Sequence, residues 1–228
     1  MTSKILYLMF CKLLMLNKRR FPSYSYNSAT GKLTTQCAPS PVHENLVSTV
    51  FTAFTTAVGG LPLLIRSSIS VVTGDEFTAF KGAYSFSKRI PDLAIKSTND
   101  KGDTDIKFAL EVGLSETYEE LLEDARLWLE GTSTVSMVLI IKLEENPRYK
   151  CPTSCLTDDE FAQLMFPPRS DIKGGLFDFD APYGPVSYKG YRWCGGITGY
   201  MEFWARDGVT GMANQITNRM VSHMWPHL

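Results

Sequence analysis

The sequence has little net charge and no long apolar run. Its 228 residues carry 23 basic and 24 acidic side chains, which gives a formal net charge of -1. Such a chain lacks the overall field that would hold it to nucleic acid or an anionic membrane, so any such contact has to come from a local patch. The apolar run between Ile5 and Leu16 is shorter than the roughly 20 residues that cross a bilayer. We therefore expect no integral membrane span.

Cysteine is also scarce. An odd number of widely spread cysteines in a chain of this size predicts mostly reduced thiols and an intracellular protein, nuclear or cytoplasmic. The five are Cys11, Cys37, Cys151, Cys155 and Cys194. The last three, with a fourth ligand from His223 or His227, could bind zinc. Their spacing is loose for four convergent ligands, which disfavours a zinc site.

The composition is that of a folded protein. Hydrophobic residues make up 44% of the chain and aromatic residues 12%, which excludes disorder, collagen and a solvated coiled coil. We predict an N-terminal extension over residues 1–20, a core domain over 21–150 and a C-terminal extension over 151–228 that packs on the core. The first of these has a basic cluster after its apolar run and lacks a small-residue cleavage site. A packed or unstructured segment is thus favoured over a targeting signal.

The pattern predicts several elements before residue 90. Residues 21–26 and 32–36 flank a turn-rich segment and predict a β-hairpin. Ser40 is suited to cap a helix that begins with Pro41 and stops at the glycine pair after Val58. Residues 63–72 and 83–87 are expected to be strands.

The segment 91–143 has the clearest pattern. Residues 92–96, 106–112 and 135–143 predict strands, and a helix over 117–130 has a capping box formed by Thr117 and Glu120. A strand, a helix and a strand of these lengths imply a right-handed crossover between parallel strands. Farther on, we expect a short helix over 158–165 and strands near 186–193 and 197–206. The predicted fold class is α/β (or α+β), with a mixed central sheet flanked by helices.

Two carboxylates are expected to face each other in this sheet. If the loop 97–105 joins its strands symmetrically, Asp92 lies opposite Glu111, and the same register pairs Leu93 with Leu110, Ile95 with Phe108 and Lys96 with Lys107. Facing like charges, with Cβ atoms about 5 Å apart, destabilise a sheet unless something neutralises them. Mg²⁺ or Mn²⁺ would do so, with the Val112 carbonyl as a third ligand. Glu44 lies in line with the apolar stripe of its helix and is expected to lean toward the same site.

These residues resemble the PD-(D/E)XK nuclease superfamily, and more narrowly fungal proteins with a divergent version of that domain. The resemblance rests on Ser40-Pro41-Val42-His43-Glu44, on the segment from Lys88 to Ile95, and on the segment from Phe108 through Glu111-Val112-Gly113 to Leu129. It covers roughly residues 21–143 and, more faintly, 188–211. It implies a restriction-endonuclease-like core made of a helix, three strands, a helix and a strand.

The resemblance also implies a function. Asp92 and Glu111 would hold the metal, Glu44 would assist, and the protein would hydrolyse nucleic-acid phosphodiesters. The family places a lysine two residues after the second carboxylate, where this chain has Gly113. Lys142 is the best-placed substitute, because parallel neighbours end at the same edge of a sheet. The predicted catalytic residues are thus Asp92, Glu111 and Lys142.

Other interpretations stay open. The domain could be catalytically inactive and bind nucleic acid or a protein, Asp92 and Glu111 could be solvated strand ends, and a homodimer is compatible with either. Lys88 and Arg89 are plausible phosphate contacts, and His43 is more typical of a helix surface or of packing than of a base. The aromatic and basic residues from Tyr183 to Trp193 are typical of single-strand nucleic-acid platforms, although half-buried strands are the commoner explanation. A purely structural protein would use these strands to bind a partner.

Overall fold

The computed structural model describes residues 23–36, 40–179, 181 and 184–222. The predictions for the N-terminal extension, for Cys11 and Cys37, for Tyr183 and for the two histidines after residue 222 lie outside these ranges. Within them, no helix is long and apolar enough to cross a membrane.

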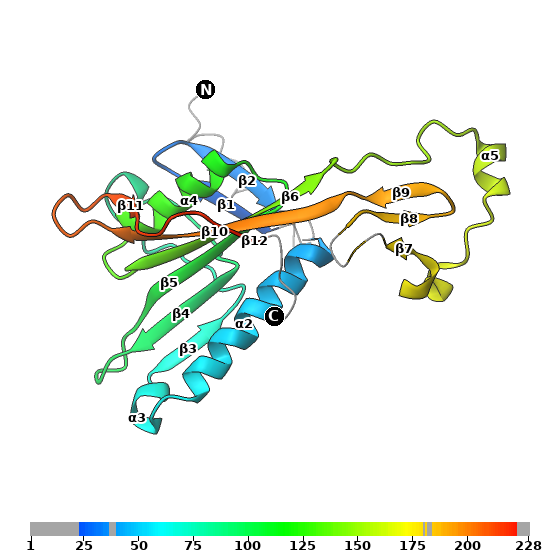
Figure 1. Ribbon diagram of the computed structural model, residues 1–228. Helices are drawn as coiled ribbons and strands as arrows, with labels where there is room; N and C mark the ends of the chain where they lie inside the picture. The colour runs from blue at the N-terminus through cyan, green and yellow to red at the C-terminus, as the bar shows by residue number, and fades with distance from the viewer. Residues whose placement is uncertain (1–22, 37–39, 180, 182–183, 223–228) are drawn as a thin grey trace, which may run out of the picture.

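A mixed sheet forms the centre of the molecule (Figure 1). Its strands are β3 (Ile69–Val72), β4 (Leu93–Thr98), β5 (Thr104–Gly113), β6 (Met137–Asn146), β10 (Gly196–Arg206), β11 (Ala213–Gln215) and β12 (Met220–Ser222). The spatial order is β11-β10-β6-β5-β4-β3, with β12 also on β10. Only β5 and β6 pair in parallel, and the other pairs of this sheet are antiparallel. The mixed central sheet predicted from the sequence is therefore confirmed.

Two of the described helices begin where the predicted capping residues place them. The α-helices of the described residues are α2 (Pro41–Gly59), α3 (Leu63–Arg66), α4 (Tyr118–Gly131) and α5 (Asp158–Gln163). The Ser40 hydroxyl accepts a hydrogen bond from the His43 N–H, and Thr117 and Glu120 form both bonds of a capping box. These caps satisfy N–H groups that a helix start leaves without partners.

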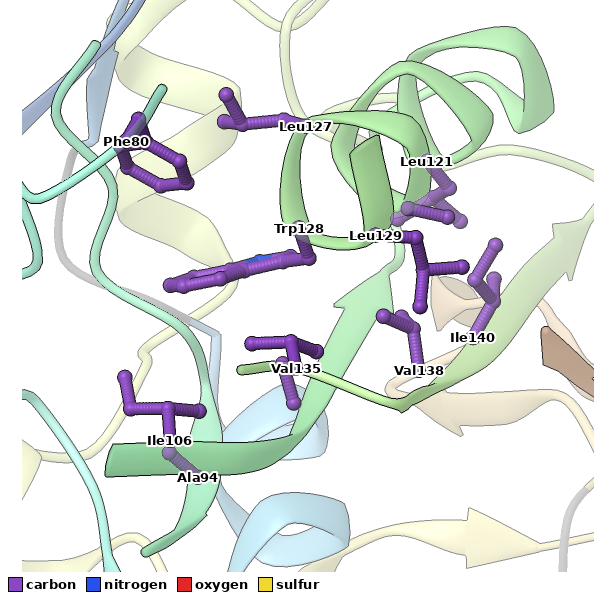
Figure 2. Packing of buried hydrophobic residues seen from close by; sticks show 12 residues of the cluster. Phe80, Ala94, Ile106, Leu121, Leu127, Trp128, Leu129, Val135, Val138 and Ile140 are labelled. Atoms are coloured by element: carbon purple, nitrogen blue, oxygen red, sulfur yellow. The ribbon is translucent and has the colours of Figure 1, made fainter. Parts of the chain in front are cut away.

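The two long helices cover opposite faces of the sheet. On one face, Val47 and Val50 of α2 pack on Leu93, Leu110 and other apolar strand residues. On the other face α4 inserts Trp128, whose indole lies against Phe80 and above Val135 (Figure 2). Since residues alternate between faces along a strand, position 110 belongs to the α2 side and position 111 to the α4 side.

The predicted register of β4 on β5 is confirmed for the first half of the ladder. Leu93 pairs with Leu110 and Ile95 with Phe108. The register then shifts, so that Lys96 pairs with Ile106 rather than with Lys107. This bulge corrects the predicted lysine pair and removes the charge repulsion that it implied.

Three predicted strands differ in the structure. The segment 63–72 divides into α3 and β3, and the segment 83–87 contains a 3-10 turn, Gly82–Tyr84, in place of a strand. The segment 186–193 is a hairpin of β8 (Val186–Tyr188) and β9 (Tyr191–Cys194), with Lys189 and Gly190 at positive φ between them. A turn of this kind needs left-handed backbone, which glycine adopts most readily.

Two smaller units adjoin the central sheet. The hairpin of β1 (Ser23–Asn27) and β2 (Lys32–Gln36) joins α4 through an ion pair between Lys32 and Glu120. The second unit combines α5 with a small sheet of β7 (Asp178–Phe179), β8 and β9, and it projects from one end of the central sheet (Figure 1). Further 3-10 turns lie at Arg169–Asp171 and Gly174–Leu176. Because β10 pairs with β6 over ten positions, the C-terminal residues extend the central sheet.

Candidate functional site

Glu111 is buried on the face of the sheet that α4 covers. The residue is only 2% exposed, and both carboxylate oxygens accept hydrogen bonds. Arg89 donates from Nε to Oε1 at 3.2 Å and from Nη2 to Oε2 at 2.7 Å. The Trp128 Nε1 donates to Oε1 at 2.7 Å. A bidentate arginine and an indole N–H therefore hold this carboxylate in one orientation.

Arg89 joins a second carboxylate to the first. Its Nη2 lies 2.5 Å from the Asp124 Oδ2, and the Arg89 side chain is 5% exposed. The backbone of Arg89 is fixed by an isolated bridge to Phe77. The prediction that Arg89 contacts phosphate is wrong for this structure, because its guanidinium is enclosed by protein carboxylates.

The carboxylates outnumber the cation in this interior. Burial raises the pKa of Glu111 to about 7 and raises the pKa of Asp124 well above its usual range, although Arg89 opposes both shifts. Burial also raises the pKa of Glu116, which interacts with Arg89 and Asp92. One guanidinium does not offset the desolvation of several acids, so the cluster tends to retain a proton near neutral pH.

Asp92 lies in a bend just before β4 and is bound by different partners. Its Oδ2 accepts a hydrogen bond from the Val112 N–H at 2.7 Å, and its Oδ1 lies 3.2 Å from the His43 Nε2. The hydrogen bond to Asp92 raises the pKa of His43. Among the described residues, Asp92 and Glu111 share no hydrogen-bonding side chain. Asp92 is held from the α2 side, whereas Glu111 is held from the α4 side.

Glu44 does not lean toward the buried side as expected. Its side chain is 60% exposed, and its Oε1 lies 3.5 Å from the His43 Nδ1. His43, one position earlier on α2, is the residue that reaches the strand carboxylate, with a side chain only 16% exposed. An open pocket of about 400 Å³ adjoins this group, and His43, Glu44, Phe51 and Asp92 are among the residues that line it.

Lys142 and Gly113 are ladder partners on β6 and β5. The Lys142 Nζ donates to the carbonyls of Leu143 at 2.7 Å and Leu114 at 3.0 Å, and burial lowers its pKa. A Cβ added at Gly113 would meet the Leu121 Cδ1 at 2.9 Å. Glycine at position 113 thus coincides with the close approach of α4 to the sheet.

The residues predicted to hold a metal do not fit one in this arrangement. The carboxylate oxygens of Glu111 accept hydrogen bonds from Arg89 and Trp128. Those of Asp92 contact the Val112 N–H and the His43 ring. Val112, whose carbonyl was predicted to be a ligand, meets Asp92 through its N–H. In the part of the chain that the structure describes, no three His, Cys, Asp or Glu side chains form a group that could hold a metal ion.

The aromatic residues of the projecting unit pack on one another. Phe166 contacts the rings of Phe161, Tyr188 and Trp193 at centroid distances of 5.4–5.7 Å. The Lys189 Nζ donates to the carbonyls of Leu164 and Met165. These contacts favour local packing over a platform for nucleic-acid bases. Three cysteines in this part of the chain are free thiols: Cys151, Cys155 and Cys194.

Sequence reasoning missed the residues that hold the two carboxylates. Trp128 falls at the spacing of the apolar stripe of its helix, which gives it no polar role, and His43 was assigned to a helix surface or to packing. A signal was present, because Asp124 and Trp128 lie four positions apart and therefore share a helix face. A buried indole N–H and a buried carboxylate both need polar partners. The identity of those partners, Arg89 and Glu111, depends on tertiary contacts.

Comparisons with protein-family models and with curated proteins give no match to this chain. The function of the site has to follow from its own chemistry.

Proposed function

We propose that the chain is a restriction-endonuclease-like domain that no longer hydrolyses phosphodiesters and acts as a binding module. One observation carries this proposal: the Arg89 guanidinium takes both oxygens of Glu111, at 3.2 and 2.7 Å. In the family that the sequence resembles, this carboxylate binds the metal. Here a protein cation supplies the positive charge, so the carboxylate is neutralised without an ion.

The order of the elements supports the restriction-endonuclease-like part of the proposal. The central region runs α2, α3, β3, β4, β5, α4, β6, and apart from the short α3 this order agrees with the helix, three strands, helix and strand that the resemblance implies. The parallel pair of β5 and β6 follows the crossover through α4. Asp92 and Glu111 also lie at the same end of neighbouring strands, as the family's acids do.

The lack of a free lysine amine near the carboxylates supports the loss of hydrolysis. No lysine is available at position 113, and the Lys142 amine is bound by two main-chain carbonyls. A group that assists an attacking water has to reach that water with a free lone pair or a free proton. The Lys142 amine would first have to leave its two carbonyls.

The charge of the pocket favours a protein partner over nucleic acid. Glu44 and Asp92 line the pocket, and Glu116 interacts with Asp92 and His43. Without a bound cation, these carboxylates repel the phosphates that supply most of the affinity for nucleic acid. A basic or neutral protein surface meets no such repulsion.

A nuclease assay tests the proposal. We expect no hydrolysis of single- or double-stranded DNA or RNA by the parent protein with Mg²⁺ or Mn²⁺, at a detection limit set by the Asp92→Ala variant. Calorimetric titration with either metal should give no saturable heat. Hydrolysis by the parent that Asp92→Ala and Glu111→Gln both abolish would establish the active nuclease instead.

A designed revertant distinguishes a disabled enzyme from an unrelated fold. Gly113→Lys alone places its Cβ against Leu121, so it should be combined with Leu121→Ala and with Arg89→Met. If the site is a disabled nuclease, this triple variant gains metal-dependent binding or cleavage that Asp92→Ala removes. The matched control carries Gly113→Met with the same two accompanying changes, because methionine lacks the amine.

A further inference from the structure

A second buried carboxylate lies on the same face of the sheet, on β10. Glu202 is 1% exposed and sits opposite Ile140 in the ladder of β10 with β6. Its Oε2 accepts hydrogen bonds from the Tyr118 hydroxyl at 2.8 Å and from the Trp204 Nε1 at 3.3 Å. The other oxygen, Oε1, accepts from the Arg219 Nε at 2.8 Å.

Arg219 completes an arrangement of rings around its cation. The guanidinium carbon lies 3.9 Å from the centroid of the Tyr200 ring and 4.9 Å from that of Tyr118. The two rings meet nearly edge to face, with centroids 6.1 Å apart. Two aromatic faces and a buried carboxylate form a site for a planar cation, since the rings attract its charge and the carboxylate accepts its N–H groups.

We propose that Tyr118, Tyr200 and Glu202 form a guanidinium-binding site, which Arg219 fills in the free protein and which an arginine side chain of a protein partner takes over. The site lies on β10 and on the first turn of α4. The proposal goes beyond the proposed function above and does not depend on it.

The chemistry of the site selects its occupant. A buried carboxylate with two neutral donors still requires a cation, because an unpaired buried charge is costly. A guanidinium fits better than an ammonium, since it is flat enough to stack on Tyr200 and is less strongly hydrated. Phosphate and carboxylate ligands are excluded by the charge of Glu202.

The exposure of Arg219 makes exchange feasible. Its side chain is 43% exposed while the Glu202 side chain is 1% exposed. Incoming and outgoing guanidinium groups therefore approach from solvent, without disruption of the sheet. Arg219 competes with an external arginine for the site beside Glu202. Because Arg219 is part of the same chain, its effect equals that of a high local concentration of arginine. Its removal should raise the apparent affinity for an external arginine.

The test uses the full chain and two small probes, N-acetyl-arginine amide and N-acetyl-lysine amide. NMR titration of the Arg219→Ala variant should show saturable shifts of the Tyr118 and Tyr200 ring signals with the arginine probe. We expect binding at least tenfold tighter than that of the lysine probe. Addition of Glu202→Gln should weaken the arginine probe by tenfold or more. Equal affinity for the arginine and lysine probes, or an affinity for the arginine probe that Glu202→Gln leaves unchanged, would contradict the proposed guanidinium site.

The parent protein gives the complementary measurement. In the free protein the chemical shift of the Arg219 Nε–H should be that of a group hydrogen-bonded to Glu202. Excess N-acetyl-arginine amide should move it toward the position of a solvated arginine, and N-acetyl-lysine amide at equal ionic strength should not. The arginine probe should bind the parent at least tenfold more weakly than it binds Arg219→Ala. Equal affinity for the two proteins would mean that Arg219 only fastens the C-terminal segment, and the proposal would fail.

Discussion

Glu111 and Glu202 are buried carboxylates on the two strands that flank β6, and they differ mainly in how exposed their arginine partners are. Glu111 and Glu202 both pair with Ile140, from β5 and β10 respectively. Each accepts a tryptophan N–H and one arginine. The Arg89 side chain is 5% exposed, however, whereas that of Arg219 is 43% exposed.

This difference separates a permanent ion pair from an exchangeable one. Water cannot replace the guanidinium of Arg89, so loss of that contact would leave desolvated charges. Water reaches much of Arg219, so its contact with Glu202 can be exchanged at a modest cost. The same pair of residue types thus stabilises the fold at one place and offers a binding site at the other.

Removal of Arg89 should give the largest effect. We expect Arg89→Met to lower the free energy of unfolding by about 3–5 kcal/mol, because Glu111 and Asp124 would be left buried without their cation. Urea denaturation followed by circular dichroism measures this loss, with Arg192→Met as the control at an exposed arginine. Addition of Glu111→Gln and Asp124→Asn should recover much of the stability. A loss under 1 kcal/mol would contradict the role given to Arg89.

The pH dependence of stability tests the Glu111 side of the comparison. Its pKa is raised from 4.5 in the unfolded chain to about 7 in the folded protein, so the folded state binds more protons between these values. The contribution of Glu111 to the free energy of unfolding should therefore be largest at or below pH 4.5. It should fall as the pH rises to about 7, by on the order of 3 kcal/mol.

Glu111→Gln should remove the part of this slope that Glu111 contributes, and Asp124→Asn should remove the part that comes from the raised pKa of Asp124. The raised pKa of His43 acts with the same sign: its contribution is complete below its ordinary pKa and is lost as the pH rises through the higher folded value. A His43→Gln variant separates this contribution from those of the carboxylates. Urea denaturation at several pH values measures the slopes, and a slope that Glu111→Gln leaves unchanged would assign the titration to other groups.

Removal of Arg219 should give the smallest effect. Since water can enter the space that the exposed guanidinium leaves beside the buried Glu202, Arg219→Ala should cost about 2 kcal/mol of the free energy of unfolding, less than Arg89→Met. Thermal unfolding measures the difference, and Arg219→Lys shows how much the charge alone contributes. If Arg219→Ala costs as much as Arg89→Met, the two ion pairs are equivalent and the contrast between them is lost.

The local features of the fold could be predicted from the sequence. Thr117 and Glu120 marked the start of α4, and the apolar alternation around Leu93 and Leu110 set the register of β4 on β5. Both signals act over short distances or through a repeating pattern. The segment 63–72 was not divided, because its two apolar stretches, on either side of Arg66, Ser67 and Ser68, are too short to show a period that separates helix from strand.

The candidate site was predicted only in part. Glu111 was placed correctly on β5 and Asp92 beside the adjoining end of β4. Their partners, which hold them from opposite sides of the sheet, were not foreseen. The bulge after Ile95 and the bend at Asp92 change which side chains contact each other. Neither feature could be predicted from the sequence pattern. Arg89 was predicted to contact phosphate, and only the carboxylates of Glu111 and Asp124 show why its guanidinium is buried instead.

The edges of the central sheet have a consequence for association. One side of β10 carries β6, and the other carries β11 and β12. At the opposite end, no described strand pairs with the outer side of β3, and the exposed Leu63 and Leu64 of α3 lie just before it. Among the described residues the sheet therefore has two edges, β3 at one end and the short β11 and β12 at the other, and none of these strands is longer than four residues. Strands this short offer few unpaired backbone N–H and C=O groups, so edge-to-edge contact between copies of this chain would form few hydrogen bonds.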